Sequence, residues 1–222
     1  MYSVTFLIVL ATVKYLKVLE STDEYYPILL TAALGAGFMT AANDFLLFII
    51  ALETLGMSAI LLSSYARLNQ RSNEAGIKYL INSAVATAIL LLGVSFIYGL
   101  TGLTNFSTVA LRLYQLNIFG IVSVPVISLI AVCLVGAIAF KLAAVPFHNW
   151  SPDVYTGAPT TTTLFLSVVS KTAAFGLAIR LFTTVFNSEL ITLLFSIIAV
   201  LSIVIGNYVG LIQLISRCSI KR

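Results

Sequence analysis

Long apolar stretches alternate with short polar breaks along almost the whole chain. A helix that crosses a bilayer needs roughly 20 predominantly apolar residues. This pattern predicts membrane elements at residues 2–19, 25–41, 43–65, 75–100, 120–156, 159–186 and 188–214. Prolines interrupt the element at 120–156, so we expect a broken helix there. The sequence therefore predicts an all-α, polytopic transmembrane helix bundle of about seven membrane elements.

The breaks between these elements are short and read as turns. Asn43-Asp44 predicts a tight turn between the second and third elements, because both residue types tolerate turn geometry. Tyr26-Pro27 suits the first turn of the second helix. A longer polar connection, residues 101–117, has room for a short amphipathic helix. None of these connections can hold a soluble domain, so we expect residues 1–222 to form a single membrane domain.

Composition supports the membrane class and limits the chemistry. Hydrophobic residues make up 60% of the chain and charged residues 9%, with a mean hydropathy of +1.07. The cysteines, Cys133 and Cys218, form no C-x-x-C pair for a metal or an iron–sulfur cluster. Any redox chemistry is therefore expected on another chain. The net charge of +4 is modest and gives no support to nucleic-acid binding.

Basic residues gather in the loops on one side of the predicted bundle. That side collects Lys14, Lys17, Arg67, Arg71, Arg217, Lys221 and Arg222, whereas the opposite side has mainly Arg112 and Arg180. The positive-inside rule makes the first face cytoplasmic or matrix. The C-terminus and the loop at residues 148–157 are then expected on that face, and the N-terminus on the other. Most of these residues are interpreted as topology anchors.

Four ionisable residues fall within the predicted spans: Glu53, Lys78, Lys141 and Lys171. A charge inside the hydrocarbon costs about 2.5–3.5 kcal/mol on insertion scales, so such residues usually serve a function. Glu53 and Lys171 lie too deep to extend into water. Lys141 ends its apolar run, and we expect its ammonium to meet freed carbonyls and internal water. Lys78, near a helix start, fits an interfacial and a functional role equally well.

The segment at residues 141–159 carries the densest set of polar and backbone-breaking residues. Its helix-breaking prolines are Pro146, Pro152 and Pro159. Asp153 is expected to cap or tie the short second half of the broken helix. His148 is either an intermediate proton site or a hydrogen-bonded structural residue. Trp150 and Tyr155 are expected at the membrane interface, where amphipathic rings usually settle.

Proton relay is the chemistry that this set of charges could perform. A lysine that has lost its water releases a proton more readily, and a neighbouring carboxylate reverses that effect. Glu53 would then act as a gate that pairs with a lysine in one state and leaves it in another. The next hop would run from Lys141 to Lys171, with water bridging the gaps.

Residues 141–159 resemble K-x-x-x-x-P-F-H-x-W-x-P-D-x-Y-x-G-A-P, the broken-helix signature of the antiporter-like, proton-translocating subunits of respiratory complex I. The resemblance favours subunit 2, called subunit N in bacteria, and it covers nearly the whole chain. Further matching segments are Asn43-Asp44, Ala51-Leu-Glu53, Glu74-Ala-Gly-Ile-Lys78-Tyr79, Ile97-Tyr98-Gly99, residues 165–171 and Gly206-Asn207. By this resemblance Glu53 is the gating glutamate, Lys78 the basic residue of the next helix, Lys141 the broken-helix lysine and Lys171 the central relay lysine.

The family usually has more helices than this chain. The resemblance places the chain at the family's third to ninth helices, without the second broken helix and the terminal lysine. Either Arg217 or Lys221 stands at the lysine of the family's Ile-Lys-Arg motif. We expect one piece of a split subunit, with a second polypeptide supplying the remaining C-terminal helices. A truncated reading frame is the alternative.

The resemblance implies a proton-translocating membrane-arm subunit of NADH:ubiquinone oxidoreductase. This chain would carry no cofactor, and FMN, iron–sulfur clusters and quinone would belong to partner subunits. The expected partners are the other membrane-arm subunits and lipids. We expect the mitochondrial inner membrane, with the N-terminus in the intermembrane space and the C-terminus in the matrix; bacterial and plastid membranes are the alternatives. The alternatives are a subunit of a cation/proton antiporter complex and a mainly structural bundle within complex I.

Overall fold

The structure is a computed structural model that describes residues 1–15, 24–119, 124–186 and 189–220. Its elements are α1 (Tyr2–Tyr15), α2 (Tyr25–Ala41), α3 (Phe45–Ser63), α4 (Gln70–Thr101), α5 (Phe106–Ile118), α6 (Val124–Leu142), α7 (Trp150–Gly157), α8 (Thr160–Phe165), the π-helical η2 (Leu166–Ser170), α9 (Lys171–Thr184) and α10 (Glu189–Ile220). Within the described ranges, 5 helices are long and apolar enough to cross a membrane, and two shorter apolar helices accompany them. The prediction of an all-α bundle of about seven membrane elements is confirmed.

Most helix bounds follow the predicted apolar stretches, and the exceptions have local causes. α2 occupies the predicted residues 25–41. α4 begins at Gln70, before the predicted residue 75, because the Asn69 side chain accepts a hydrogen bond from the Arg71 N–H at 3.0 Å and caps the helix. The short amphipathic helix expected in the long connection is α5, which buries only one face. α4 is therefore longer at its start than its apolar stretch predicted, because its first turn consists of polar residues.

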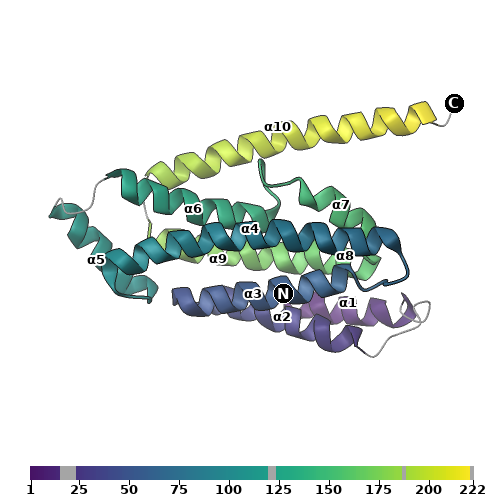
Figure 1. Cartoon of the computed structure of the whole chain (residues 1–222), viewed down its shortest axis with the longest axis horizontal. Helices are drawn as coiled ribbons and strands as arrows, with labels where there is room; N and C mark the ends of the chain where they lie inside the picture. The colour runs from purple at the N-terminus through teal and green to yellow at the C-terminus, as the bar shows by residue number, and fades with distance from the viewer. Residues whose placement is uncertain (16–23, 120–123, 187–188, 221–222) are drawn as a thin grey trace.

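α2 and α3 pack side by side near one edge of the bundle, α4 and α9 lie beside them, and α6 lies beyond these two helices (Figure 1). The close approach of α2 and α3 requires Gly35, because a Cβ there would lie 2.7 Å from the Leu55 backbone nitrogen. α4 runs along α6 and α7, and it thereby joins both halves of the broken helix to the bundle. Through these contacts α4 packs against both α3 and α6.

α10 stands at the edge of the bundle and leans away from it toward its C-terminal end (Figure 1). Its apolar window Ile191–Val209 is only 6% buried. One polar contact joins α10 to the break in the broken helix, where the Val145 N–H donates to the Ser202 hydroxyl oxygen at 3.0 Å. Most of the apolar surface of α10 between Ile191 and Val209 is therefore available to lipid or to other protein.

One end of the bundle is closed by a hydrogen-bonded junction between two loops. The Asp44 carboxylate caps α3 by accepting from the Leu46 N–H at 2.8 Å, and it also accepts from the Thr104 hydroxyl at 2.6 Å. The Phe106 N–H donates to the Asn43 carbonyl at 3.0 Å. The predicted turn at Asn43-Asp44 therefore also anchors the start of α5.

The sidedness of the bundle remains a prediction. Arg67 pairs with Glu24 at 3.1 Å on the surface, and Arg180 donates to the carbonyls of Ala41 and Ala42 at 2.7 and 3.1 Å. These contacts satisfy helix ends without revealing which face is cytoplasmic. Five of the basic residues on which the predicted sidedness rests lie outside the described residues or side chains: Lys14, Lys17, Arg217, Lys221 and Arg222.

Candidate functional site

The broken helix ends its first half directly after Lys141. α6 stops at Leu142, and Ala143 adopts a left-handed backbone with φ 55°. The Ala144 N–H donates to the Ala139 carbonyl at 2.9 Å and the Ala143 N–H to the Phe140 carbonyl at 3.0 Å, which is the bonding of a Schellman cap. A cis Val145-Pro146 bond follows, and α7 begins at Trp150. The structure thus shows the break where the prolines predicted it.

The carbonyls at this break do not bind the lysine, so the expectation that freed carbonyls meet its ammonium was wrong. The internal water that was expected beside them stays a prediction. The Schellman cap uses the carbonyls of Ala139 and Phe140, and the latter also accepts from the Trp150 indole N–H at 3.2 Å. The Lys141 Nζ is buried and has no hydrogen-bond partner among the described residues. Backbone and indole N–H groups thus occupy these carbonyls, and the ammonium has no carbonyl partner at the break.

The Lys141 ammonium lies between α3 and α4. The residue is 4% exposed, and its Nζ is 6.0 Å from the centroid of the Tyr79 ring. A Cβ added to Gly56 would lie 3.1 Å from this Nζ and 3.8 Å from the Ser83 hydroxyl oxygen. The missing side chain at Gly56 therefore makes the room that the lysine occupies.

Glu53 lies one helical turn before Gly56 on the same face of α3. It is half-buried, and its Oε1 accepts a hydrogen bond from the Thr87 hydroxyl of α4 at 2.6 Å. Glu53 is close enough to Lys141 for their charges to interact. No ion pair joins them, because the salt bridges in the described part of the chain involve other residues. The structure brings the predicted gate and the broken-helix lysine together in an unpaired arrangement.

Lys171 follows the π-helical turn η2, which interrupts the long helix formed by α8 and α9. The lysine is half-buried, and its Nζ lies 5.6 Å from the centroid of the Tyr155 ring. π-helical turns inside α-helices are frequent at functional sites. Sequence reasoning missed this turn, since its residues Leu166–Ser170 match an ordinary apolar helix.

An aromatic group stands between the two lysines. Trp150 stacks on Tyr79 with ring centroids 4.7 Å apart and meets the Tyr155 ring edge-on at 6.1 Å. Lys141 lies over the Tyr79 ring and Lys171 over the Tyr155 ring. The prediction that Trp150 sits at the membrane interface is wrong, because this ring is buried between α4, α6 and α7. The Tyr155 hydroxyl is also buried and has no hydrogen-bond partner among the described residues.

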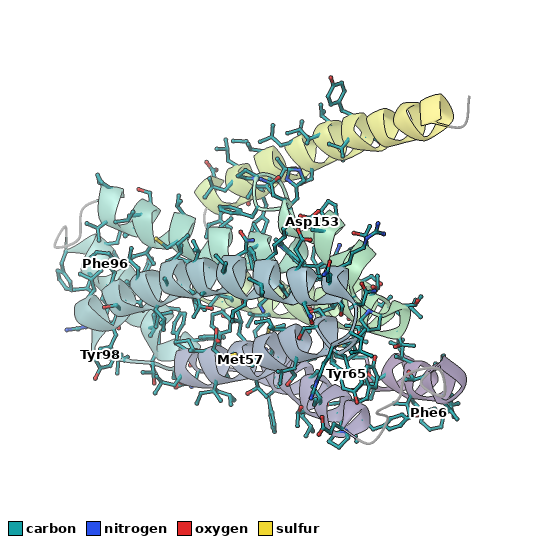
Figure 2. The ribbon with its side chains drawn as sticks, turned by 45° about the vertical axis from the view of Figure 1, so that its right-hand side comes forward. Phe6, Met57, Tyr65, Phe96, Tyr98 and Asp153 are labelled. Carbon is teal, nitrogen blue, oxygen red and sulfur yellow. The ribbon has the colours of Figure 1, made fainter. Side chains whose placement is uncertain are left out.

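Lys78 lies away from this buried group, at the exposed start of α4. Its Nζ contacts the Asp153 carboxylate at 2.6 Å and the Glu74 carboxylate at 2.7 Å. Asp153, labelled in Figure 2, therefore ties α7 to α4. It does not cap α7, whose N-cap is Asn149 and has no side-chain cap bond. These exposed side chains keep the second half of the broken helix against the bundle.

His148 occupies the turn between α6 and α7 and is half-buried. Its carbonyl accepts from the Ser151 N–H at 3.0 Å and the Ser151 hydroxyl at 2.9 Å, whereas its Nδ1 is buried without a partner in the described structure. No hydrogen bond joins its ring to Lys141 or Lys171 in that part of the chain. Its role as an intermediate proton site therefore stays a prediction.

Metal ligands do not cluster in the residues that the structure describes. No group of three or more His, Cys, Asp or Glu side chains gathers there in a way that could hold a metal ion. Cys133 is a free, buried residue on α6. The functional candidates are therefore the buried charges together with the polar and aromatic groups around them.

Two relatives match most of this chain. NAD(P)H-quinone oxidoreductase subunit 2 of Prochlorococcus marinus (strain MIT 9312) is 45% identical over 192 residues, which cover 86% of this chain and 37% of that protein. The organellar chromatophore form from Paulinella chromatophora is 46% identical over 202 residues, covering 90% and 38%. The chain thus spans little more than a third of the length of these relatives. Their sources are cyanobacterial or chromatophore, which gives the expected mitochondrial location no support.

Solved structures contain the same arrangement of helices. A chain of respiratory complex I from Thermus thermophilus with bound aureothin aligns with a TM-score of 0.64 and 31% identity, covering 80% of this chain and 38% of that one. A chain of the membrane-bound sulfane sulfur reductase, an archaeal respiratory membrane complex, aligns with a TM-score of 0.79 over 90% of this chain and 39% of that one. Its identity of 24% shows the fold alone.

The family described as NADH:quinone oxidoreductase/Mrp antiporter, TM, matches residues 42–222. The predicted resemblance to antiporter-like subunit 2 is confirmed by this match and by the relatives. This chain is a multi-pass membrane protein that belongs to the NADH:quinone oxidoreductase/Mrp antiporter transmembrane family.

Proposed function

We propose that this chain forms a proton-conducting part of the antiporter-like subunit 2 of a multisubunit NAD(P)H-quinone oxidoreductase. The observation that carries the proposal is the buried Lys141 ammonium, which has no hydrogen-bond partner in the described structure and lies near the Glu53 carboxyl. A buried, unpartnered charge is costly and is rarely kept for stability alone. Family membership suggests a task for this charge, since the family is that of NADH:quinone oxidoreductases and Mrp antiporters.

The proposed path uses the buried groups in the order of their contacts. Glu53 approaches and leaves Lys141, and this movement changes how firmly Lys141 holds its proton. Water then carries the proton past the aromatic group to Lys171, because no described side-chain hydrogen bond connects the two lysines. Low local polarity strengthens each of these charge interactions relative to water.

Lys78 and His148 take secondary places in this proposal. Lys78 holds α7 to α4 through Asp153, and it thereby keeps the broken helix and its aromatic group in position. His148 lies in the turn between α6 and α7, and protons from one membrane face would pass through it to reach Lys141. Pro146, Pro152 and Pro159 keep the helix open at this place.

The electron-transfer chemistry would belong to other subunits. We assign NAD(P)H oxidation, FMN, the iron–sulfur clusters and quinone reduction to partner chains, and proton movement to this one. The named relatives favour an energy-converting membrane of the cyanobacterial or chromatophore type. The basic face would lie on the cytoplasmic side or its organellar equivalent. The helices that complete the longer relatives would pack on the exposed surface of α10.

Native purification tests the membership, and one substitution tests the path. The proposal expects flavin and iron–sulfur subunits among the chains that copurify, identified by mass spectrometry. It also expects Glu53→Gln to lower the rate of proton pumping per assembled complex about tenfold or more, since positioned proton-transfer groups contribute at least that much. Glu24→Gln is the matched control, because Glu24 is an exposed carboxylate paired with Arg67.

Two results would contradict the proposal. Copurification without any flavin or iron–sulfur subunit would favour a cation/proton antiporter complex instead. Full pumping by the assembled Glu53→Gln complex would remove Glu53 from the path and leave a structural role for this bundle.

A further inference from the structure

We propose that Thr87 is a positioning residue that holds the Glu53 carboxyl apart from Lys141 and so sets the balance between the paired and separated states. This inference rests on the proposed function, in which the movement of Glu53 controls Lys141. Thr87 lies on α4 and Glu53 on α3, so the hydrogen bond between them crosses a helix–helix contact.

The Thr87 bond differs from the bonds of the other threonines of α3 and α4, the two helices that it joins. Thr54, the neighbour of Glu53, donates to the carbonyl of Ile50 in its own helix at 2.7 Å, and Thr101 donates to Ile97 in the same way at 2.7 Å. Such local bonds are the usual resting place of a threonine hydroxyl in a helix. The Thr87 hydroxyl instead reaches a carboxyl on another helix at 2.6 Å, within the range of charge-assisted O–H···O bonds.

Thr87 and Lys141 compete for the same carboxyl. The Lys141 Nζ is buried without a hydrogen bond in the described structure, and Glu53 is the acidic group that acts on it electrostatically. Pairing would relieve the cost of that unsatisfied ammonium. The structure nevertheless shows Glu53 bound to Thr87. The hydroxyl therefore offers Glu53 an alternative partner, which keeps the separated state populated.

α4 carries this competing group on the face that lines the lysine. Tyr79, Ser83 and Thr87 recur every four residues and so lie along one face of the helix. Tyr79 contacts the ammonium with its ring, and Ser83 points its hydroxyl at the space beside Gly56. This face of α4 thus extends from Lys141 to Glu53, and its three side chains are uncharged.

The test removes the hydroxyl and then restores it in the assembled complex. Thr87→Val keeps the shape of the side chain but cannot donate, and we expect it to lower the rate of proton pumping about tenfold, the effect of losing one charge-assisted hydrogen bond. Thr87→Ser should keep the rate within about twofold of the unmodified complex, because it retains the donor. Thr54→Val is the matched control and should leave pumping unchanged, since its hydroxyl bonds only to its own helix.

A second measurement reads the hydrogen bond itself. The infrared band of the Glu53 carboxyl, assigned by its loss in Glu53→Gln, should move in Thr87→Val and stay in place in Thr87→Ser. If Thr87→Val prevents assembly, Thr87→Ala carries the same expectations for both readouts.

The outcomes separate this inference from the proposed function. A Glu53→Gln complex that pumps at the full rate overturns the proposed function. A pumping defect in Glu53→Gln combined with full pumping in Thr87→Val overturns the role of Thr87 alone. Equal defects in Thr87→Val and Thr87→Ser would also overturn it, because packing and not the hydroxyl would then explain the loss.

Discussion

Replacing Lys141 by methionine should stabilise the folded bundle while it stops proton movement. Lys141 is 4% exposed, and its Nζ has no hydrogen-bond partner in the described structure. A lysine at the centre of a membrane helix costs about 2.5–3.5 kcal/mol on insertion scales. Methionine is also long and unbranched, but it carries no charge to desolvate and adapts to irregular spaces.

The expected gain is smaller than the full cost of the charge. Attraction between Lys141 and Glu53 already offsets part of the cost. Glu53 would lose that interaction in the variant, but it would keep its hydrogen bond from Thr87. We therefore expect Lys141→Met to raise the free energy of unfolding by about 1–2 kcal/mol.

The assay is denaturant-induced unfolding of the full chain in lipid–detergent micelles. Leu134→Met is the matched control, because Leu134 is fully buried on the same helix and the swap conserves volume. Such a swap usually costs less than about 1.5 kcal/mol. A Lys141→Met chain more than about 1 kcal/mol less stable than the unmodified chain would refute the reasoning, since the ammonium would then have a stabilising partner.

Three further substitutions, the first with a matched control, test how the helices pack. Gly35→Ala places a methyl group against the α3 backbone and should lower the free energy of unfolding by about 1–3 kcal/mol; Gly99→Ala, in open space, should be neutral or slightly stabilising in the same unfolding assay. Asp153→Asn should speed hydrogen exchange of the α7 amides measured by mass spectrometry, because it weakens the tie to α4; unchanged exchange would contradict that role. Trp150→Phe should cost about 1 kcal/mol of stability, since the Phe140 carbonyl loses one of its two donors, and a neutral result would show that this bond adds nothing.

Hydropathy predicted where the helices lie but not which faces meet. The apolar stretch at residues 25–41 gave α2 at the same bounds, because a membrane helix must satisfy its backbone internally. In a bilayer, however, lipid-facing and inward-facing side chains are both apolar, so the hydropathy pattern does not distinguish the two faces of a helix. Trp150 illustrates the consequence: its amphipathic ring suited a membrane interface, whereas the structure buries it against Tyr79.

The charges of the candidate site were predictable, and their partners were not. Glu53, Lys141 and Lys171 stood out because ionisable residues within spans are rare. Thr87 carried no such signal, since threonine occurs throughout membrane helices and usually bonds to its own backbone. The lack of a carbonyl partner for Lys141 was also missed, because the Schellman cap that uses the freed carbonyls depends on the left-handed backbone of Ala143.

Proton pumping by the assembled complex carrying Lys171→Met tests the central claim most directly. The measurement is the rate of proton movement per assembled complex, with assembly checked by the copurifying chains. A fall of about tenfold or more is expected, because in the proposed path Lys171 accepts the proton that leaves Lys141. Pumping at the full rate and stoichiometry would contradict the proposed path, because it would show that Lys171 carries no proton.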